Sequence, residues 1–236
     1  MNQDLDQTLQ QFTEDLKQIY PDNLLAIILY GSAASDEFVE GRSNINCLIL
    51  LKEVTPDELK KCTAPLPGWH KKGISTPLFV DPPYIRSSVD VFPMEFLDMK
   101  QRYRLLFGQD FLHSLELNLE YLRFQCEQEL KGKMLKLRQL YVEKSGSEKQ
   151  LAAFLAKSIS SFMVHFRALL HLKGMSPPRS AEEIFGSLAQ MGLPTEAIRR
   201  VHSLKHESVT LGPVELNALF KDYVSEIQSA VKCVEK

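Results

Sequence analysis

The spacing of apolar positions changes near residue 110 and separates two kinds of structure. Before that point, short apolar runs at 25–30 and 45–51 are bounded by Gly, Ser and Asn, which is typical of buried strands. An amphipathic segment over about residues 2–19 predicts a helix ahead of them, and Pro56 opens another. We therefore expect a small mixed sheet with helices in this half.

The remainder of the first half is less regular. The passage from Pro65 to Pro83 is rich in proline and predicts an irregular surface excursion or a helix entry. The run from Ser88 to Asp98 is interpreted as a later strand, because its end is apolar around a single carboxylate, Glu95. After this run the pattern predicts helices only.

Beyond residue 110 the pattern is helical. Apolar residues recur in steps of three and four from Leu117 to Tyr141, which describes one face of a long helix. A break at Ser145 precedes a second long helix at about 149–172, which ends at Gly174 and two prolines. Shorter helices are expected near 180–191, 194–206 and 213–233.

These patterns divide the chain into two predicted domains. Residues 1–110 form the sheet-containing domain and residues 111–236 an all-α antiparallel helical bundle, so the predicted fold class is α+β. No internal repeat or low-complexity tract interrupts either half.

The most specific pattern lies at residues 27–51, which read IILYGSAASDEFVEGRSNINCLILL. A strand that ends in Gly31-Ser32 and opens a helix aims backbone N–H groups and a hydroxyl at an anion, and a triphosphate is the obvious ligand. Because alternate residues of a strand share a face, Asn44 and Asn46 are predicted to point into one pocket. Ile45 and Cys47 would pack behind them.

This segment resembles the signature of the nucleotidyltransferase superfamily, in which apolar-Gly-Ser is followed by two acidic residues at alternate positions of the next strand. The resemblance implies that Gly31, Ser32, Arg42 and Ser43 bind a nucleoside triphosphate, and that positions 44 and 46 hold Mg²⁺. A mixed sheet followed by a helical bundle is similar to superfamily members with a C-terminal substrate-binding bundle, such as the aminoglycoside-modifying type.

Asparagine at positions 44 and 46 changes the chemistry that the resemblance implies. Magnesium prefers anionic oxygens, and an amide oxygen brings a dipole without net charge. Each missing carboxylate removes about 4 kcal/mol of attraction for a unit charge at ~4 Å and an effective dielectric of ~20. A two-metal mechanism is therefore not expected, and the site is interpreted as degenerate.

The superfamily has a third carboxylate on a later strand, and two residues are candidates for that position. Glu95 is the first choice and Asp90 the second. If the site is active, both would be catalytic and Glu95 would be a metal ligand beside Asn44 and Asn46. The alternative is that Glu95 caps a neighbouring helix or forms a salt bridge with it.

The composition indicates an ordinary globular protein, with 44% hydrophobic and 25% charged residues and a net charge of −2. The N-terminus has no signal-peptide pattern, and the apolar run Leu24 to Tyr30 is too short to cross a bilayer. The four cysteines, at positions 47, 62, 126 and 233, form no C-x-x-C pair. A cytoplasmic protein without a membrane partner is expected, and none of the cysteines is predicted to be catalytic.

Charge is divided unevenly between the halves. Residues 1–110 hold 11 Lys and Arg against 16 Asp and Glu, and residues 111–236 hold 17 against 14, so they net −5 and +3. Arg123, Lys131 and Arg138 on the first long helix are the candidate wall for an unidentified small-molecule or protein acceptor. A basic face with so few charges is usually a solvated helix surface. Nucleic-acid binding is therefore not predicted. The sequence does not decide whether the protein forms a homo-oligomer.

The histidines suggest one further hypothesis. His202 and His206 are spaced i, i+4, but the intervening residues lack the glutamate of a zinc protease. Arg200 and His206 also resemble the arginine-histidine motif of small helical RNases, in which arginine holds the phosphate and histidine moves a proton.

Three functions therefore remain open after the sequence analysis. The first is a degenerate nucleotidyltransferase that binds nucleotide in a regulatory role, with weak or no catalysis. The second is an active nucleotidyltransferase that moves a nucleoside monophosphate through a one-metal site. The third is a partner-binding or RNA-cleaving helical protein.

Overall fold

The computed structural model describes residues 3–35, 44–175, 178, 180–205 and 211–235. The chain divides into two compact units, Met1–Leu117 and Asn118–Lys236.

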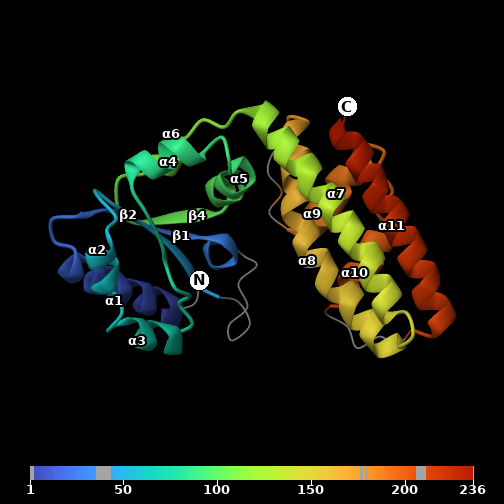
Figure 1. Ribbon diagram of the computed structural model, residues 1–236, viewed down its shortest axis with the longest axis horizontal. Coiled ribbons are helices and arrows are strands. Elements are labelled where there is room, and N and C mark those ends of the chain that lie inside the picture. The colour runs from blue at the N-terminus through green and yellow to red at the C-terminus, as the bar shows by residue number, and fades with distance from the viewer. Residues whose placement is uncertain (1–2, 36–43, 176–177, 179, 206–210, 236) are drawn as a thin grey trace. The chain divides into compact units, whose positions relative to one another are not determined.

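A four-stranded sheet forms the centre of the first unit (Figure 1). Its order is β3-β2-β1-β4, in which β1 pairs antiparallel with β2 and β4, and β2 pairs parallel with β3. The strands are β1 Leu24–Tyr30, β2 Asn46–Leu51, β3 Leu78–Val80 and β4 Tyr103–Gly108. The two central strands are largely buried, which explains why both read as continuous apolar runs.

Helices cover both faces of this sheet (Figure 1). On one face, Phe12 of α1 and Trp69 of α3 pack in a cluster with Leu29 and Cys47. On the other face, α4, α5 and α6 supply Ile85, Phe96 and Leu112 to a second cluster. The helices of this unit are α1 Gln3–Ile19, α2 Pro56–Lys60, α3 Leu66–Lys71, α4 Pro82–Ser88, α5 Pro93–Gln101 and α6 Phe111–Ser114, and Gly31–Ala34 form the 3₁₀ turn η1.

Prolines mark two helix entries of the predicted kind, Pro56 ahead of the proline-rich passage and Pro82 within it. Thr55 accepts the Glu58 N–H at 3.2 Å ahead of α2, and Asp81 accepts the Tyr84 N–H at 2.8 Å ahead of α4. Each side chain satisfies a donor that the first helical turn leaves without a backbone partner. Pro56 follows one cap and Pro82 the other, at a position where proline's missing N–H costs nothing.

The predicted strand around Glu95 is wrong, because Pro93 starts the helix α5 there. The buried residues are Pro93 and the residues one, three and four positions after it: Met94, Phe96 and Leu97. This spacing places them on one face of a helix, whereas a strand would bury every second residue. Glu95 points to the exposed side of its first turn. The expectation of helices only beyond this run is also wrong, since β4 follows at Tyr103–Gly108.

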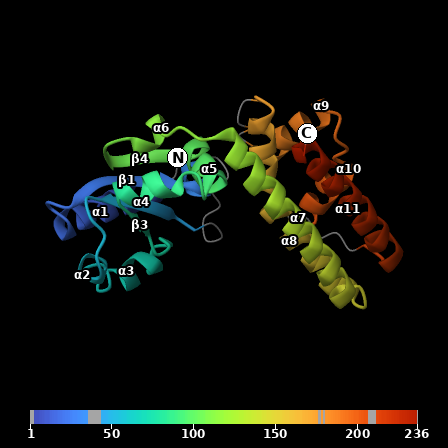
Figure 2. The same ribbon diagram turned by 45° about the horizontal axis from the view of Figure 1, so that its top comes forward.

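The described residues of the second unit form a bundle of five helices, as predicted. These are α7 Leu119–Lys144, α8 Glu148–Leu172, α9 Ala181–Gln190, α10 Glu196–Ser203 and α11 Pro213–Glu235. The long helices α7, α8 and α11 lie side by side in both views (Figures 1 and 2). Among the described residues, α8 alone is long and apolar enough to cross a membrane, and 56% of its most apolar window is buried inside the protein.

A buried carboxylate fixes the start of α10. Glu226 of α11 is almost fully buried, and its two oxygens accept the N–H groups of Ala197 and Ile198 at 3.0 and 2.8 Å. Thr195, at the N-cap position, makes no side-chain capping bond. Glu226 therefore caps α10 from a neighbouring helix and complements the positive end of its dipole.

Candidate functional site

The candidate site lies where β1, β2 and β4 come together beside the Gly31-Ser32 turn. Tyr30, the last residue of β1, stands directly across from Asn46 on β2 and Tyr103 on β4. Residues directly across from each other share a face of the sheet, so these three side chains form one row. The row consists of one amide and two phenols, and none of the three carries charge at neutral pH.

The pairing pattern agrees with the predicted strand geometry. Ile45 and Cys47 are buried in the cluster beneath the sheet, whereas Asn46 is half-buried and Asn44 is exposed. Alternation therefore keeps positions 44 and 46 on the side away from that cluster. Arg42 and Ser43 lie outside the described residues.

Gly31 follows Tyr30 and makes the turn from β1 into η1 beside the row. Its φ of +78° is a left-handed conformation that favours glycine, and a Cβ there would lie 3.6 Å from Nδ2 of Asn46. Its N–H donates to the carbonyl of Arg102 at 3.0 Å, so this donor serves the junction with β4 rather than an anion. Ser32 is half-buried in η1, a single 3₁₀ turn in place of the predicted helix start.

An ion pair borders the row. The Nη2 of Arg102 lies 2.7 Å from both carboxylate oxygens of Asp98, and the two side chains are only 13% and 20% exposed. Burial raises the pKa of Tyr30, with smaller contributions from Cys47 and Asp98. The carboxylate of Asp98 is therefore already neutralised by an arginine and supplies no free charge for a metal ion.

The β4 position of the row has its own partner. The Tyr103 hydroxyl donates to Oδ2 of Asp110 at 2.9 Å, and Oδ1 of Asp110 accepts the His113 N–H at 3.0 Å. Burial and this hydrogen bond raise the pKa of Tyr103, so the phenol stays protonated. Asp110 thus links α6 to β4, and each of its two carboxylate oxygens accepts a hydrogen bond.

The predicted third-carboxylate residues lie elsewhere. Glu95 is exposed on α5, and Asp90 is exposed in the turn between α4 and α5. Within the described residues no group of three or more His, Cys, Asp or Glu side chains is arranged to hold a metal ion.

Tyr30, Tyr103 and the Asp98–Arg102 pair were not among the site residues predicted from the sequence. The i, i+4 spacing of Asp98 and Arg102 was a readable signal for a helix in this stretch. With residues 93–101 assigned to α5, the next segment that can form a strand is Tyr103–Gly108.

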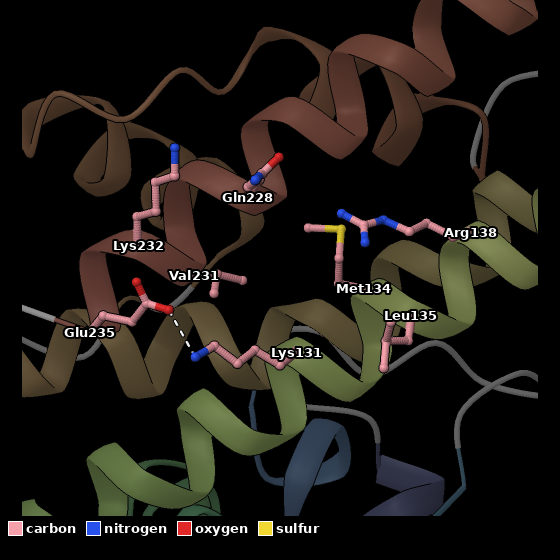
Figure 3. A pocket seen from close by; sticks show the side chains of 8 residues that line it. All are labelled: Lys131, Met134, Leu135, Arg138, Gln228, Val231, Lys232 and Glu235. Atoms are coloured by element: carbon pink, nitrogen blue, oxygen red, sulfur yellow. Dashed lines mark ion pairs between the residues drawn. The ribbon is translucent and has the colours of Figure 1, made fainter.

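Two of the three predicted acceptor-wall residues line a groove of about 340 Å³ between α7 and α11 (Figure 3). Lys131 and Arg138 border it, with Met134 and Val231 among the apolar lining residues. Lys131 bridges the two helices, since its Nζ lies 2.6 Å from Glu127 and 2.9 Å from Glu235. Arg123 pairs with Glu127 at 2.9 Å on the same helix.

The histidines and cysteines have structural surroundings. His165 is buried, with Nδ1 2.9 Å from the Ser161 carbonyl and Nε2 2.9 Å from Glu129, and burial lowers its pKa. Arg200 is exposed on α10, and His206 lies outside the described residues. Burial raises the pKa of both Cys47 and Cys126 to about 12, so neither thiol is a ready nucleophile at neutral pH.

Comparison with known proteins gives a likeness of fold. No protein-family profile matches the sequence, and no curated protein is similar to it in sequence. Among solved structures, the spectinomycin adenyltransferase AAD(9) from Enterococcus faecialis, crystallised with ATP and spectinomycin, is similar at a TM-score of 0.56 and 10% identity. The likeness covers 94% of this chain and 98% of that one. The chain therefore has a nucleotidyltransferase-like α+β fold followed by a helical bundle.

Proposed function

We propose that this protein is a nucleotidyltransferase-like module that binds a nucleotide beside the Gly31-Ser32 turn, with little or no transfer of a nucleoside monophosphate. The observation that carries the proposal is the uncharged row Asn46, Tyr30 and Tyr103 on a fold shared with an ATP-bound adenyltransferase. The fold likeness supports a nucleotide as ligand, and the row supports the loss of catalysis.

The loss of catalysis follows from the charge that phosphoryl chemistry needs. Transfer from a triphosphate depends on divalent ions that brace the phosphates and activate the acceptor. Asn44 and Asn46 offer amide oxygens, Tyr103 offers a phenol bound to Asp110, and Asp98 is paired with Arg102. A magnesium ion at this row would meet dipoles in place of negative charges.

The placement of Glu95 and Asp90 does not favour the active alternative. Both side chains are exposed, one on a helix and one in a turn, and neither lies on a strand of the sheet. For the RNA-cleaving alternative, the described residues include only the arginine of the motif.

Calorimetric titration of ATP, GTP, CTP and UTP, with Mg²⁺ and again with a chelator, tests the proposal. We expect binding of at least one nucleotide that survives chelation, and no pyrophosphate release over hours. Ser32→Ala should weaken binding, whereas Ser229→Ala, an equally conservative change on α11 in the other unit, should leave it unchanged. Magnesium-dependent pyrophosphate release would show an active enzyme instead, and absence of binding in both buffers would reduce the first unit to a scaffold.

A further inference from the structure

The helix α7 carries a second stripe on the side away from the bundle core. Its core side holds Leu122, Cys126, Leu130, Met134 and Leu137. On the opposite side Tyr121, Phe124 and Leu135 are 48%, 63% and 59% exposed. Large apolar side chains exposed together on one element mark an interaction surface more often than chance.

The stripe has coiled-coil spacing. It consists of six residues separated by steps of three and four along α7: Tyr121, Phe124, Gln128, Lys131, Leu135 and Arg138. At ~100° per residue they fall within an arc of about 100°. This 3-4 repeat is the pattern by which one helix packs its length against another. The buried face of α7 packs in its own bundle, and the stripe touches the bundle only at its edge, where Lys131 pairs with Glu235 of α11.

We propose that a second copy of this chain docks on the stripe, with the two α7 helices antiparallel about a two-fold axis. An axis between residues 129 and 130 brings Phe124 opposite Leu135 of the second copy. The same axis brings Tyr121 opposite Arg138 and Gln128 opposite Lys131. Each contact then occurs twice, as a two-fold interface requires, and the Tyr121–Arg138 pairing allows a cation–π contact.

The charges along the stripe select this orientation. Glu120 and Glu127 border its N-terminal half, and Lys131 and Arg138 stand in its C-terminal half. Antiparallel docking brings Glu120 of one copy beside Arg138 of the other, whereas parallel docking would bring like charges together. Lys131 and Glu127 are already paired within each copy at 2.6 Å, so neither adds uncompensated charge at the axis.

The groove between α7 and α11 adjoins the stripe and shares Lys131, Leu135 and Arg138 with it (Figure 3). The second copy's α7 would therefore lie beside a hollowed, partly apolar surface rather than on a single convex helix. The stripe itself spans 18 residues, or ~27 Å. That length gives an interface at the small end of specific ones, so the dimer should dissociate on dilution.

Sedimentation velocity of the full chain over a range of concentrations tests the proposal. We expect a monomer–dimer equilibrium that Leu135→Glu shifts to monomer by at least about 100-fold in dissociation constant, because the change buries two carboxylates. Val214→Glu is the matched control, since Val214 on α11 is 82% exposed and outside the stripe. Far-UV circular dichroism would verify that both variants keep their helices.

A charge swap tests the orientation. Glu120→Lys and Arg138→Glu should each weaken the dimer by about tenfold, and the double variant should associate more tightly than Arg138→Glu alone, although it still lacks the Tyr121–Arg138 contact. A dimer that ignores Leu135→Glu would overturn the proposal, as would a chain that stays monomeric up to about 100 μM. Such a monomer would assign the stripe to a contact within one chain or to a different protein. A double variant that associates no more tightly than Arg138→Glu would overturn the antiparallel register.

Discussion

Carboxylates placed at positions 44 and 46 should create a metal site beside the row. The perturbation is Asn44→Asp with Asn46→Asp, two nearly isosteric changes at positions that alternation keeps on one side of the sheet. If the fold of this segment is that of a nucleotidyltransferase, the backbone already presents both side chains correctly. The protein should then gain affinity for Mg²⁺ or Mn²⁺ without rearrangement.

The two positions should contribute unequally. One carboxylate at ~4 Å from a divalent ion gains about 8 kcal/mol of attraction at an effective dielectric of ~20, before the cost of dehydrating the ion. Asn46 is half-buried beside Gly31, whereas Asn44 is exposed and its charge would be screened by water and salt. We therefore expect Asn46→Asp alone to give most of the gain and Asn44→Asp alone to give little.

The new carboxylate at position 46 should also affect stability. Without metal it would be half-buried close to Tyr30. Burial raises the pKa of the Tyr30 hydroxyl, and Asp98 adds to this effect. The same surroundings disfavour an ionised carboxylate, so the double variant should unfold at lower temperature than the parent in chelator. Adding Mn²⁺ should recover that loss.

Isothermal titration and thermal unfolding, each with Mn²⁺ and with chelator, measure both effects. Gln139→Glu with Gln150→Glu is the matched control, because it adds the same charge at exposed positions of α7 and α8. If the double Asp variant binds Mn²⁺ no better than this control, residues 44 and 46 do not converge as a nucleotidyltransferase site, and the reasoning from the signature fails.

Three other predictions concern the supporting structure. Glu226→Ala should destabilise the bundle by about 3–5 kcal/mol in urea unfolding, because it leaves two buried N–H groups of α10 without acceptors, and Glu226→Gln should cost less. Gly31→Ala should cost about 1–2 kcal/mol in the same assay, mainly through the left-handed backbone, since the added Cβ meets Asn46 only at ordinary contact distance. In alkylation at pH 8 followed by mass spectrometry, partly exposed Cys233 should react first. Cys47 and Cys126 should stay unmodified until unfolding, because a pKa of about 12 keeps each thiol protonated.

The sequence predicted most of the helices and both central strands for clear physical reasons. The bundle helices are long, and each repeats its apolar positions over several turns, so their bounds agree with the structure to within a few residues. The strands β1 and β2 are buried on both faces and read as apolar runs. Such signals are local and need no knowledge of distant partners.

The errors lie where local pattern and tertiary context disagree. Pro93 lies in an apolar run that resembles a strand in sequence. Proline, however, favours the first turn of a helix, and α5 starts at this residue. The true strand, Tyr103–Gly108, has a charged residue in its interior because Arg104 pairs with Asp6 of α1 at 2.8 Å. That contact joins residues 98 positions apart, and no window of sequence contains it.

The missed strand matters for function because it supplies the third member of the row. Carboxylates that converge at the end of a sheet would repel one another unless a cation held them. At the row this chain has Asn46, Tyr30 and Tyr103, and the carboxylates of Asp98 and Asp110 beside it are bound to Arg102 and to the Tyr103 hydroxyl. The polar side chains described at the row are therefore uncharged, and the carboxylates beside it have protein partners. A sheet end built this way is stable without a metal ion, which agrees with the proposed role of this site in binding a nucleotide rather than in phosphoryl transfer.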